Sequence, residues 1–259
     1  MALEIQNKRI VGTIDNLQEK LNGKLPVDRV ELLYLINSWG RSQDFSTSEN
    51  ILIPECGATQ CYDLSKLDTS EITDMNGLFK YSMFNNIHST NGIGLHNGDI
   101  SNWDVSKVTD MSQMFYAARN FNQALNNWDV SNVTDMSFMF FNVNNNFNQD
   151  INNWNVSSVT NMSWMFAGAI NFNQHILWDL SNVEAAFDVF YDAIAFETKF
   201  NNGNSLPYYT EDIKLWLEKN SEKMNIIDIK DTHGKEIDDF FSKFTNINIE
   251  INSIQRKEI

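Results

Sequence analysis

The chain has 259 residues, of which 42% are hydrophobic and 12% aromatic, so it carries enough apolar side chains to fill a core and does not read as a disordered chain. Its 34 acidic and 19 basic residues give a net charge of −15. Binding to phosphates requires lysine and arginine, so this balance argues against nucleic acid as a partner and equally against an anionic membrane surface. No apolar run is long enough to cross a bilayer, so membrane insertion is not expected.

Residues 1–60 lie ahead of any clear repeat and are predicted to form a helical N-terminal cap followed by a loop. Thr13 is placed to cap a short helix that stops at Gly23. A second helix, opened by a proline, is predicted from Val27 to about Trp39. We expect this pair of helices to cover the first open edge of a repeat structure.

The loop of this first segment holds the two cysteines of the chain, Cys56 and Cys61. With four residues between them, they could close a small disulfide or supply half of a metal site. No second Cys/His pair stands nearby, so two free thiols in a reducing compartment are the simpler interpretation.

The segment 61–200 is built from an internal repeat. One copy reads Trp-Asp-Val-Ser-Asn-Val-Thr-Asp-Met-Ser-Phe-Met-Phe and begins at Trp128. Related copies begin at Trp103, Trp154, Trp178 and, more faintly, Leu67. The four tryptophans are 25, 26 and 24 residues apart, and a period of this length is typical of a solenoid whose turns pack on their neighbours. About five turns are predicted, with an insertion at 80–99.

Each turn is predicted to contain a short helix and a short strand. Met136, Met139 and Phe140 follow the i, i+3, i+4 spacing of one helical face, and a threonine stands before them as an N-cap. Trp128 and Val130 stand two residues apart, as on one side of a strand. Stacked turns would give a parallel sheet on one face and short helical turns on the other, so the predicted fold class is an α/β solenoid.

Residues 201–259 are predicted to form divergent turns that cap the C-terminal end. Thr210 begins a helix, and the isoleucines of 227–229 mark a strand. A second helix is expected over 237–244 and a final alternating strand over 247–251. The predicted C-terminal cap therefore runs helix–strand–helix–strand.

Polar residues alternate with the buried positions of each predicted strand and should face solvent. We call them the Asp/Asn row: Asn102, Asp104, Asn127, Asp129, Asn153, Asn155 and Asp179. Because neighbouring strands lie about 5 Å apart, the row would be a rigid polar surface suited to a protein or glycan partner. Two alternatives stay open. The Asp-x-Ser pattern could serve only to nucleate a turn, and stacked carboxylates could attract Ca²⁺, although no known Ca²⁺-repeat spacing is present.

The other repeated side chains are better explained as scaffold. The tryptophans would form a platform for sugar rings if they were exposed, but their spacing, like that of the methionines, favours a place in the core. The column Asn122, Asn148 and Asn173 is predicted to satisfy backbone amides of loops.

Residues for catalysis are few. The histidines are scattered, at His88, His96, His175 and His233. No nucleophile-elbow, zinc-protease or phosphate-loop motif occurs. We therefore expect no enzymatic activity, no cofactor and no metal site.

The repeat string, followed in each regular turn by Phe-Asn-Gln, resembles that of the BspA-like leucine-rich-repeat proteins, a family widespread on bacterial surfaces. The similarity is specific from Trp103 to Asn173 and weaker at Leu67 and Trp178. It implies a leucine-rich-repeat-like solenoid, a role in adhesion or protein–protein contact, and no enzymatic activity. The C-terminal segment does not match the family's repeat.

Two functions are open. The first is a non-enzymatic bacterial recognition module, related to adhesion or virulence, that binds a protein or glycan, including host molecules, through the Asp/Asn row or the 85–98 loop. The alternative is a secreted effector or toxin component in which the repeat targets the protein and residues 205–259 act. The N-terminus lacks the apolar core of a secretory signal. We expect a cytoplasmic location or export without a signal, and a surface or secreted location if a signal has been trimmed.

Overall fold

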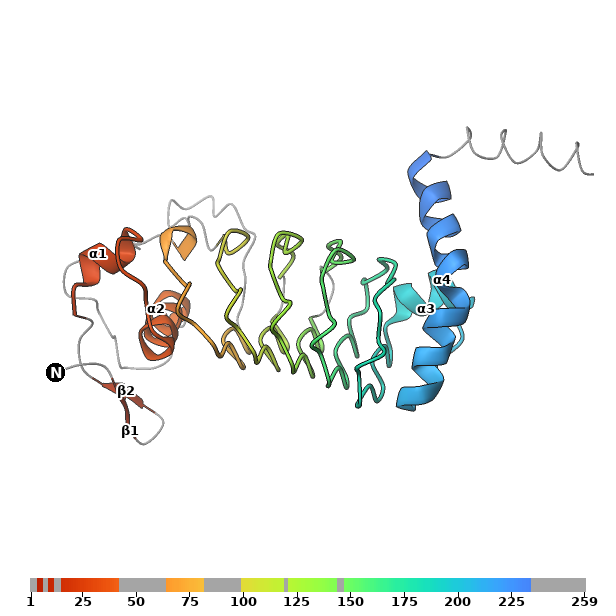
Figure 1. The fold of residues 1–259 in the computed structure, drawn as a ribbon, viewed down its shortest axis with the longest axis horizontal. Coiled ribbons are helices and arrows are strands. Elements are labelled where there is room, and N and C mark those ends of the chain that lie inside the picture. Colours follow the sequence, from red (N-terminus) through yellow and green to blue (C-terminus); the bar gives the residue numbers. More distant parts are fainter. Residues whose placement is uncertain are drawn as a thin grey trace, which may run out of the picture.

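The computed structural model of the chain describes residues 4–6, 9–11, 15–41, 64–81, 99–118, 121–143 and 147–233. Strands β1 (Glu4–Gln6) and β2 (Arg9–Val11) pair antiparallel near the N-terminus, followed by α1 (Leu17–Leu21), α2 (Arg29–Arg41) and the 3-10 helix η1 (Leu64–Lys66). A row of stacked turns comes next, and α3 (Ile194–Asn201) and α4 (Thr210–His233) lie at the far end of it (Figure 1). The cysteine pair and the 85–98 loop lie outside the described residues.

Helix α2 begins later than predicted because Asp28 caps it. The Asp28 carboxylate accepts the Glu31 backbone N–H at 2.8 Å, and the Glu31 carboxylate accepts the Asp28 N–H at 2.9 Å. This reciprocal arrangement is a capping box, which fixes the first helical residue at Arg29. Val27, predicted as helical, instead donates its N–H to the carbonyl of Asp68 at 3.0 Å and ties the helix pair to the first turn.

Five successive turns are held in register by parallel backbone bridges that link Asp74, Asp110, Asp135, Asn161 and Ala185. Four backbone N–H groups of each turn donate to carbonyls of the next turn. Between the second and third turns the donors are Met111, Gln113, Phe115 and Ala117, at 2.7–2.9 Å. The equivalent bonds at the other three interfaces run in the same direction. We call residues 67–81 and 99–193 the repeat stack.

The predicted short helices are absent from the described part of the repeat stack, which forms β-turns there instead. The Met139 N–H closes a turn on the Met136 carbonyl at 3.2 Å, and Phe138 within that turn has a φ of 56°. Alternate N–H groups close turns while the remaining ones cross to the next turn of the stack. A left-handed residue in each turn interrupts both helical and extended backbone.

The predicted parallel sheet is also wrong, because each Trp-x-Val segment is a short link between two turns and not a strand. Trp128 donates its N–H to Leu125 at 3.1 Å, and Val133 donates to Val130 at 2.9 Å. The apolar residues therefore follow steps of three, two and three, which bury the same side chains that a strand would bury. Among the described residues, β1 and β2 are the only strands, and they lie outside the stack.

The C-terminal prediction of helix–strand–helix–strand is wrong where the structure describes it. Helix α4 continues to His233 and includes the segment 227–229 that was predicted as a strand. Ile213, Leu217 and Met224 keep helical spacing and are all buried, so the helix has a packed face from Ile213 to Met224. The elements predicted beyond residue 233 lie outside the described residues.

The core of the stack consists of aromatic columns that run along its length. The Phe115, Phe140, Phe166 and Phe190 rings are parallel, with centroids 5.5 Å apart at each step. A second column of phenylalanines stands beside it, with centroids 5.8–6.1 Å apart. Because each turn buries its rings against the next, no turn can complete its core alone.

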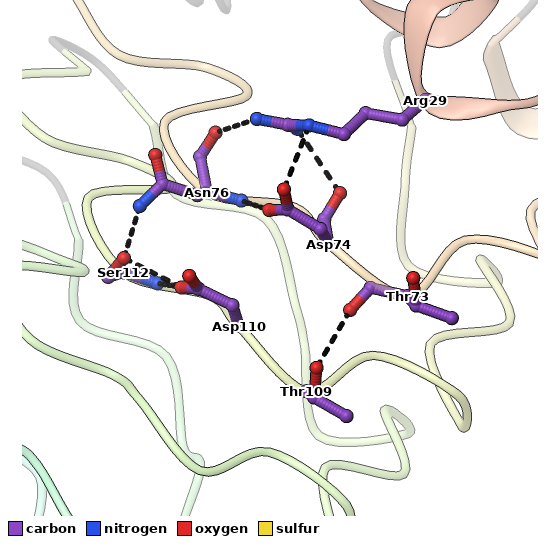
Figure 2. A network of polar contacts seen from close by, with 7 residues as sticks. All are labelled: Arg29, Thr73, Asp74, Asn76, Thr109, Asp110 and Ser112. Atoms are coloured by element: carbon purple, nitrogen blue, oxygen red, sulfur yellow. Dashed lines mark hydrogen bonds and ion pairs between the residues drawn. The ribbon is translucent and has the colours of Figure 1, made fainter.

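Both ends of the stack are closed by side chains that replace a missing turn. At the first turn, the Arg29 guanidinium donates to the carbonyls of Asp74 (3.2 Å) and Asn76 (2.9 Å), and Figure 2 shows it beside them. At the last turn, the Ala186 N–H donates to the Thr210 hydroxyl at 2.9 Å, from the start of α4. These contacts satisfy backbone groups that would otherwise form an open edge.

Candidate binding surfaces

The structure places every member of the Asp/Asn row on the surface. In the third turn, Trp128 and Val130 are buried on either side of exposed Asp129, with exposed fractions of 4% and 1%. The direction of these side chains is therefore as predicted, although the backbone is a turn. The row is backed by the aromatic core, which holds its members at repeating positions.

Each aspartate or asparagine that precedes the serine also stabilises its own turn. The Oδ1 of Asp104, Asp129, Asn155 and Asp179 accepts the backbone N–H of the serine two residues later, at 2.9–3.1 Å. The side-chain-to-backbone bond on which the turn alternative depends is therefore present. It does not oppose a binding role, because the side chains remain exposed.

Hydrogen bonds to serine keep part of the row anionic. The Ser106 hydroxyl, together with the Ser106 N–H, lowers the pKa of Asp104 below its ordinary value. The Ser181 N–H and hydroxyl lower the pKa of Asp179 in the same way. Both carboxylates are therefore ionised at neutral pH, and the row presents fixed negative charge.

A second ladder of Asp-x-Ser turns was missed by the sequence reasoning. The residues Asp110, Asp135 and Asn161, which were expected to begin short helices, accept the N–H of Ser112, Ser137 and Ser163 at 2.7–3.1 Å. The threonines before them do not cap helices. Instead, the Thr134 hydroxyl donates to the Thr109 carbonyl of the preceding turn at 3.0 Å. Figure 2 shows the same contact between Thr109 and Thr73.

The scaffold interpretation of the other columns is confirmed. Trp103, Trp128 and Trp154 are buried, and their indole N–H groups donate to carbonyls of the preceding turn at 2.9–3.0 Å. Asn148 accepts the Asn173 N–H at 2.9 Å and so satisfies a loop amide. The repeat methionines are buried as well. These buried tryptophans and methionines are therefore not available to a sugar or another ligand.

Aromatic side chains outside the core form a continuous strip along the stack, which the sequence reasoning did not single out. We call it the aromatic stripe: Tyr81, Tyr116, Phe138, Phe141, Trp164 and Tyr191. Successive rings are in contact, with centroids 4.7–6.3 Å apart. Tyr81 and Tyr191 are 66% and 61% exposed, and the members between them are partly exposed.

Three members of the stripe occupy strained backbone positions. Phe138 and Trp164 have φ values of 56° and 61°, at the place where the first turn has Gly77, and Tyr81 has a φ of 61° at the second left-handed position of the first turn. A positive φ costs an ordinary side chain roughly 1–2 kcal/mol, and large side chains rarely adopt it. The turn itself therefore does not require aromatic residues there. The variable residue in Met-Ser-x-Met was the available sequence signal, because the core leaves that position unspecified.

Acidic residues follow the stripe in the last turn. Asp188 occupies the position that Trp164 holds one turn earlier, and burial raises the pKa of its carboxyl. Asp192 is exposed nearby in sequence, and burial raises the pKa of Glu197, with a smaller contribution from Asp192. The C-terminal end of the stripe therefore has an electronegative neighbourhood.

The described residues contain neither a metal-binding cluster nor a helix that could span a membrane. No group of three or more His, Cys, Asp or Glu side chains lies in an arrangement that could hold a metal ion there. No helix within the described ranges combines the length and apolar character needed to cross a membrane.

Comparison with known proteins finds one family. The model of a family described as "Mycoplasma protein of unknown function, DUF285" matches residues 52–93 and 81–203, which together make up more than half of the chain. The match is consistent with the resemblance to a BspA-like repeat family. No curated protein and no solved structure matches the chain.

Proposed function

This chain belongs to the mycoplasma protein family of unknown function DUF285, and we propose that it is a non-enzymatic recognition module. It binds a protein or glycan partner through side chains on the outside of its repeat stack and contributes to adhesion at a bacterial surface. The kinship with BspA-like surface proteins is part of this proposal. The Asp/Asn row is the candidate surface that the sequence singles out.

The observation that carries the proposal is the repetition of exposed polar side chains on a fixed backbone. Asp104, Asp129 and Asp179 recur at equivalent positions, and each is held by its own serine. A partner meeting this surface would lose little free energy to ordering of the protein, because the side chains are already positioned. Binding sites need such pre-organisation, whereas a purely structural turn needs only the hydrogen bond.

The contacts of α4 favour this function over an effector whose activity resides in residues 205–259. Thr210, Ile213 and Leu217 are buried against the end of the stack, and Lys214 donates to the Val183 carbonyl at 3.0 Å. A segment used as a lid for the last turn has a structural role that requires no separate activity. Residues 234–259 lie outside the described part, so the effector alternative rests on them.

The test is capture of a partner by the purified chain from host-cell or cell-envelope extract. Replacing Asp104, Asp129 and Asp179 together with lysine should abolish capture, because it reverses the charge of exposed members of the row. Each substitution also removes one hydrogen bond from a serine N–H, so circular dichroism checks that the fold is kept. The matched control replaces exposed Asp99, Asp150 and Asp212, which changes the net charge equally, and should retain capture.

Capture that survives the row substitutions would exclude the Asp/Asn row and direct attention to the 85–98 loop or the aromatic stripe. If the unaltered chain captures nothing from any extract, the recognition function itself is contradicted.

A further inference from the structure

The aromatic stripe already holds one cation of the chain itself. The Lys80 Nζ lies 4.6 Å from the centroid of the Tyr116 ring and 5.4 Å from that of Tyr81. The two rings meet at 75°, so the ammonium group is close to both of them. This is the geometry of a cation–π contact, in which the negative face of a ring attracts a positive charge.

The same pairing of tilted rings recurs farther along the stripe. Trp164 meets Phe141 at 57° with centroids 6.3 Å apart, and meets Tyr191 at 57° with centroids 5.9 Å apart. Within the part of the chain that the structure describes, no lysine or arginine lies over these later rings. The stripe therefore has one ring pair that holds a cation and two similar pairs that do not.

Negative charge at the C-terminal end of the stripe favours a cationic ligand. Asp188 follows Trp164 at the equivalent position in the last turn, and exposed Asp192 comes soon after. Burial penalises the charged form of the Asp188 carboxyl, and an approaching cation would reverse that penalty. The whole chain carries a net charge of −15, which also attracts a basic partner from a distance.

We propose that the Trp164 ring and its neighbours Phe141 and Tyr191 bind arginine or lysine side chains of an extended basic segment in a protein partner. This inference rests on the proposed recognition function, and it adds a second contact surface and the chemistry of the partner segment that this surface binds. Arginine is the preferred side chain, because its flat guanidinium stacks on aromatic faces and also pairs with carboxylates.

The ring geometry favours this partner over a glycan. Sugars stack on aromatic faces that lie open side by side, whereas successive rings in this stripe are tilted against one another or stacked face to face. Tyr116 and Phe141, for example, cover each other at 4.7 Å and 16°.

The experiment measures binding of a labelled peptide of alternating arginine and serine to the full chain by fluorescence anisotropy. A second peptide carries neutral citrulline in place of arginine, and a short glucose oligomer serves as the glycan probe. The variant Trp164→Leu with Tyr191→Leu keeps apolar bulk and net charge but removes two rings. We expect its Kd for the arginine peptide to rise roughly three- to tenfold, and Trp164→Phe to restore most of the affinity.

Two controls separate this site from non-specific attraction. Tyr209→Leu removes an aromatic ring that is 62% exposed, close to the 61% of Tyr191, and lies outside the stripe, so it should leave Kd unchanged. Asp99→Asn with Asp150→Asn lowers the acidic charge at exposed positions outside the stripe and the Asp/Asn row, and should weaken binding less than the ring substitutions do. The inference is overturned if the double leucine variant binds like the unaltered chain, if a control weakens binding as much, or if the citrulline peptide or glucose oligomer binds as well as the arginine peptide.

Results that contradict the aromatic stripe can be distinguished from results that contradict the recognition function. A chain that captures a partner from extract, with retention unaffected by Trp164→Leu and no affinity for the arginine peptide, contradicts only the stripe. A chain that captures no partner contradicts the recognition function.

Discussion

At the scale of single residues, the left-handed positions decide which side chains a turn can carry. Each turn has two left-handed positions, and the residues at the second of them are Tyr81, Ala117, Asn142, Gly168 and Asp192, with φ values of 50–70°. The column therefore accepts ordinary side chains as well as glycine. Gly168 differs from the others because a Cβ atom placed there would collide with the Asn142 side chain of the preceding turn.

We predict that Gly168→Ala destabilises the protein by about 2 kcal/mol, because it combines a positive φ with that collision. The free energy of unfolding from urea denaturation is the measurement. Gly203→Ala is the matched control, since Gly203 has a φ of 76° and a Cβ atom there would meet no other atom within 4 Å, so it should cost only about 1 kcal/mol.

Combining Gly168→Ala with Asn142→Ala should bring the loss back close to that of the control. If Gly168→Ala costs no more than Gly203→Ala, the packing of the Asn142 side chain on the glycine is not what constrains this position.

Side-chain direction was the most predictable property at this scale. Trp128 and Val130 are buried and Asp129 is exposed, because steps of three, two and three residues in the apolar pattern allow little else. Trp164 and Phe138 could not be assigned from the same pattern. They stand at a position that the core leaves open, so their contacts depend on which residues the neighbouring turns carry.

At the scale of elements, the caps have to replace hydrogen bonds that a further turn would supply. Arg29 does so at the first turn with two hydrogen bonds to carbonyls, and its Nε also pairs with the Asp74 carboxylate at 3.0 Å. One planar guanidinium thus reaches acceptors on two residues, which an ammonium group cannot reproduce in the same geometry.

We predict that Arg29→Met lowers the free energy of unfolding by about 1–2 kcal/mol, reduced from the value of a buried site because the group is partly exposed. Arg29→Lys should recover only part of the loss. Hydrogen exchange should accelerate first at Met75 and Gly77, whose N–H groups join the first turn to the second. Lys107→Met, which removes the exposed ion pair with Glu71, is the control and should cost less stability than Arg29→Met does.

Equal protection of Met75 and Gly77 in Arg29→Met and in the unaltered protein would mean that the cap does not hold the first turn.

The type of backbone structure within each repeat was harder to predict from the sequence than the repeat itself. Met136, Met139 and Phe140 have helical spacing, yet the Asp135 carboxylate holds the Ser137 N–H in a turn, and the Phe138 N–H crosses to the next copy. Local side-chain bonds of this kind compete with helix formation, and the bonds to the next turn decide the outcome. Those bonds join residues about 25 positions apart, so no short window of sequence contains them.

At the scale of the whole molecule, the stack has a direction. Alternate N–H groups from Met111 to Ala117, and their equivalents in the other turns, donate to carbonyls of the following turn. The equivalent carbonyls of the first turn and N–H groups of the last turn therefore have no partner within the stack. Arg29 supplies donors at one end, whereas Thr210 and the Tyr208 carbonyl supply acceptors at the other, receiving the N–H groups of Ala186 and Asp188. The two caps are chemically opposite because the edges they cover are opposite.

The C-terminal cap should therefore fold only in contact with the repeat stack. We predict that residues 205–259, expressed alone, show no cooperative unfolding transition by circular dichroism and little dispersion of amide signals by NMR. Ile213, Leu217 and Met224 are at most 7% exposed in the full chain, and the fragment would leave their apolar faces in water. Acidic residues in the first turn of α4 allow some helix, but most of the stability of a helix in a protein comes from packing of its apolar face, which the fragment lacks.

A substitution in the full chain tests the same contact between α4 and the last turn. Thr210→Val in the full chain removes the acceptor for the buried Ala186 N–H and should cost about 1–3 kcal/mol, while Thr210→Ser keeps the hydroxyl and should cost less. A fragment of residues 205–259 that folds cooperatively would show that α4 does not need the stack, and an activity of that fragment would favour the effector. An unfolded fragment together with a destabilised Thr210→Val chain would instead tie α4 to the last turn, as its buried contacts require.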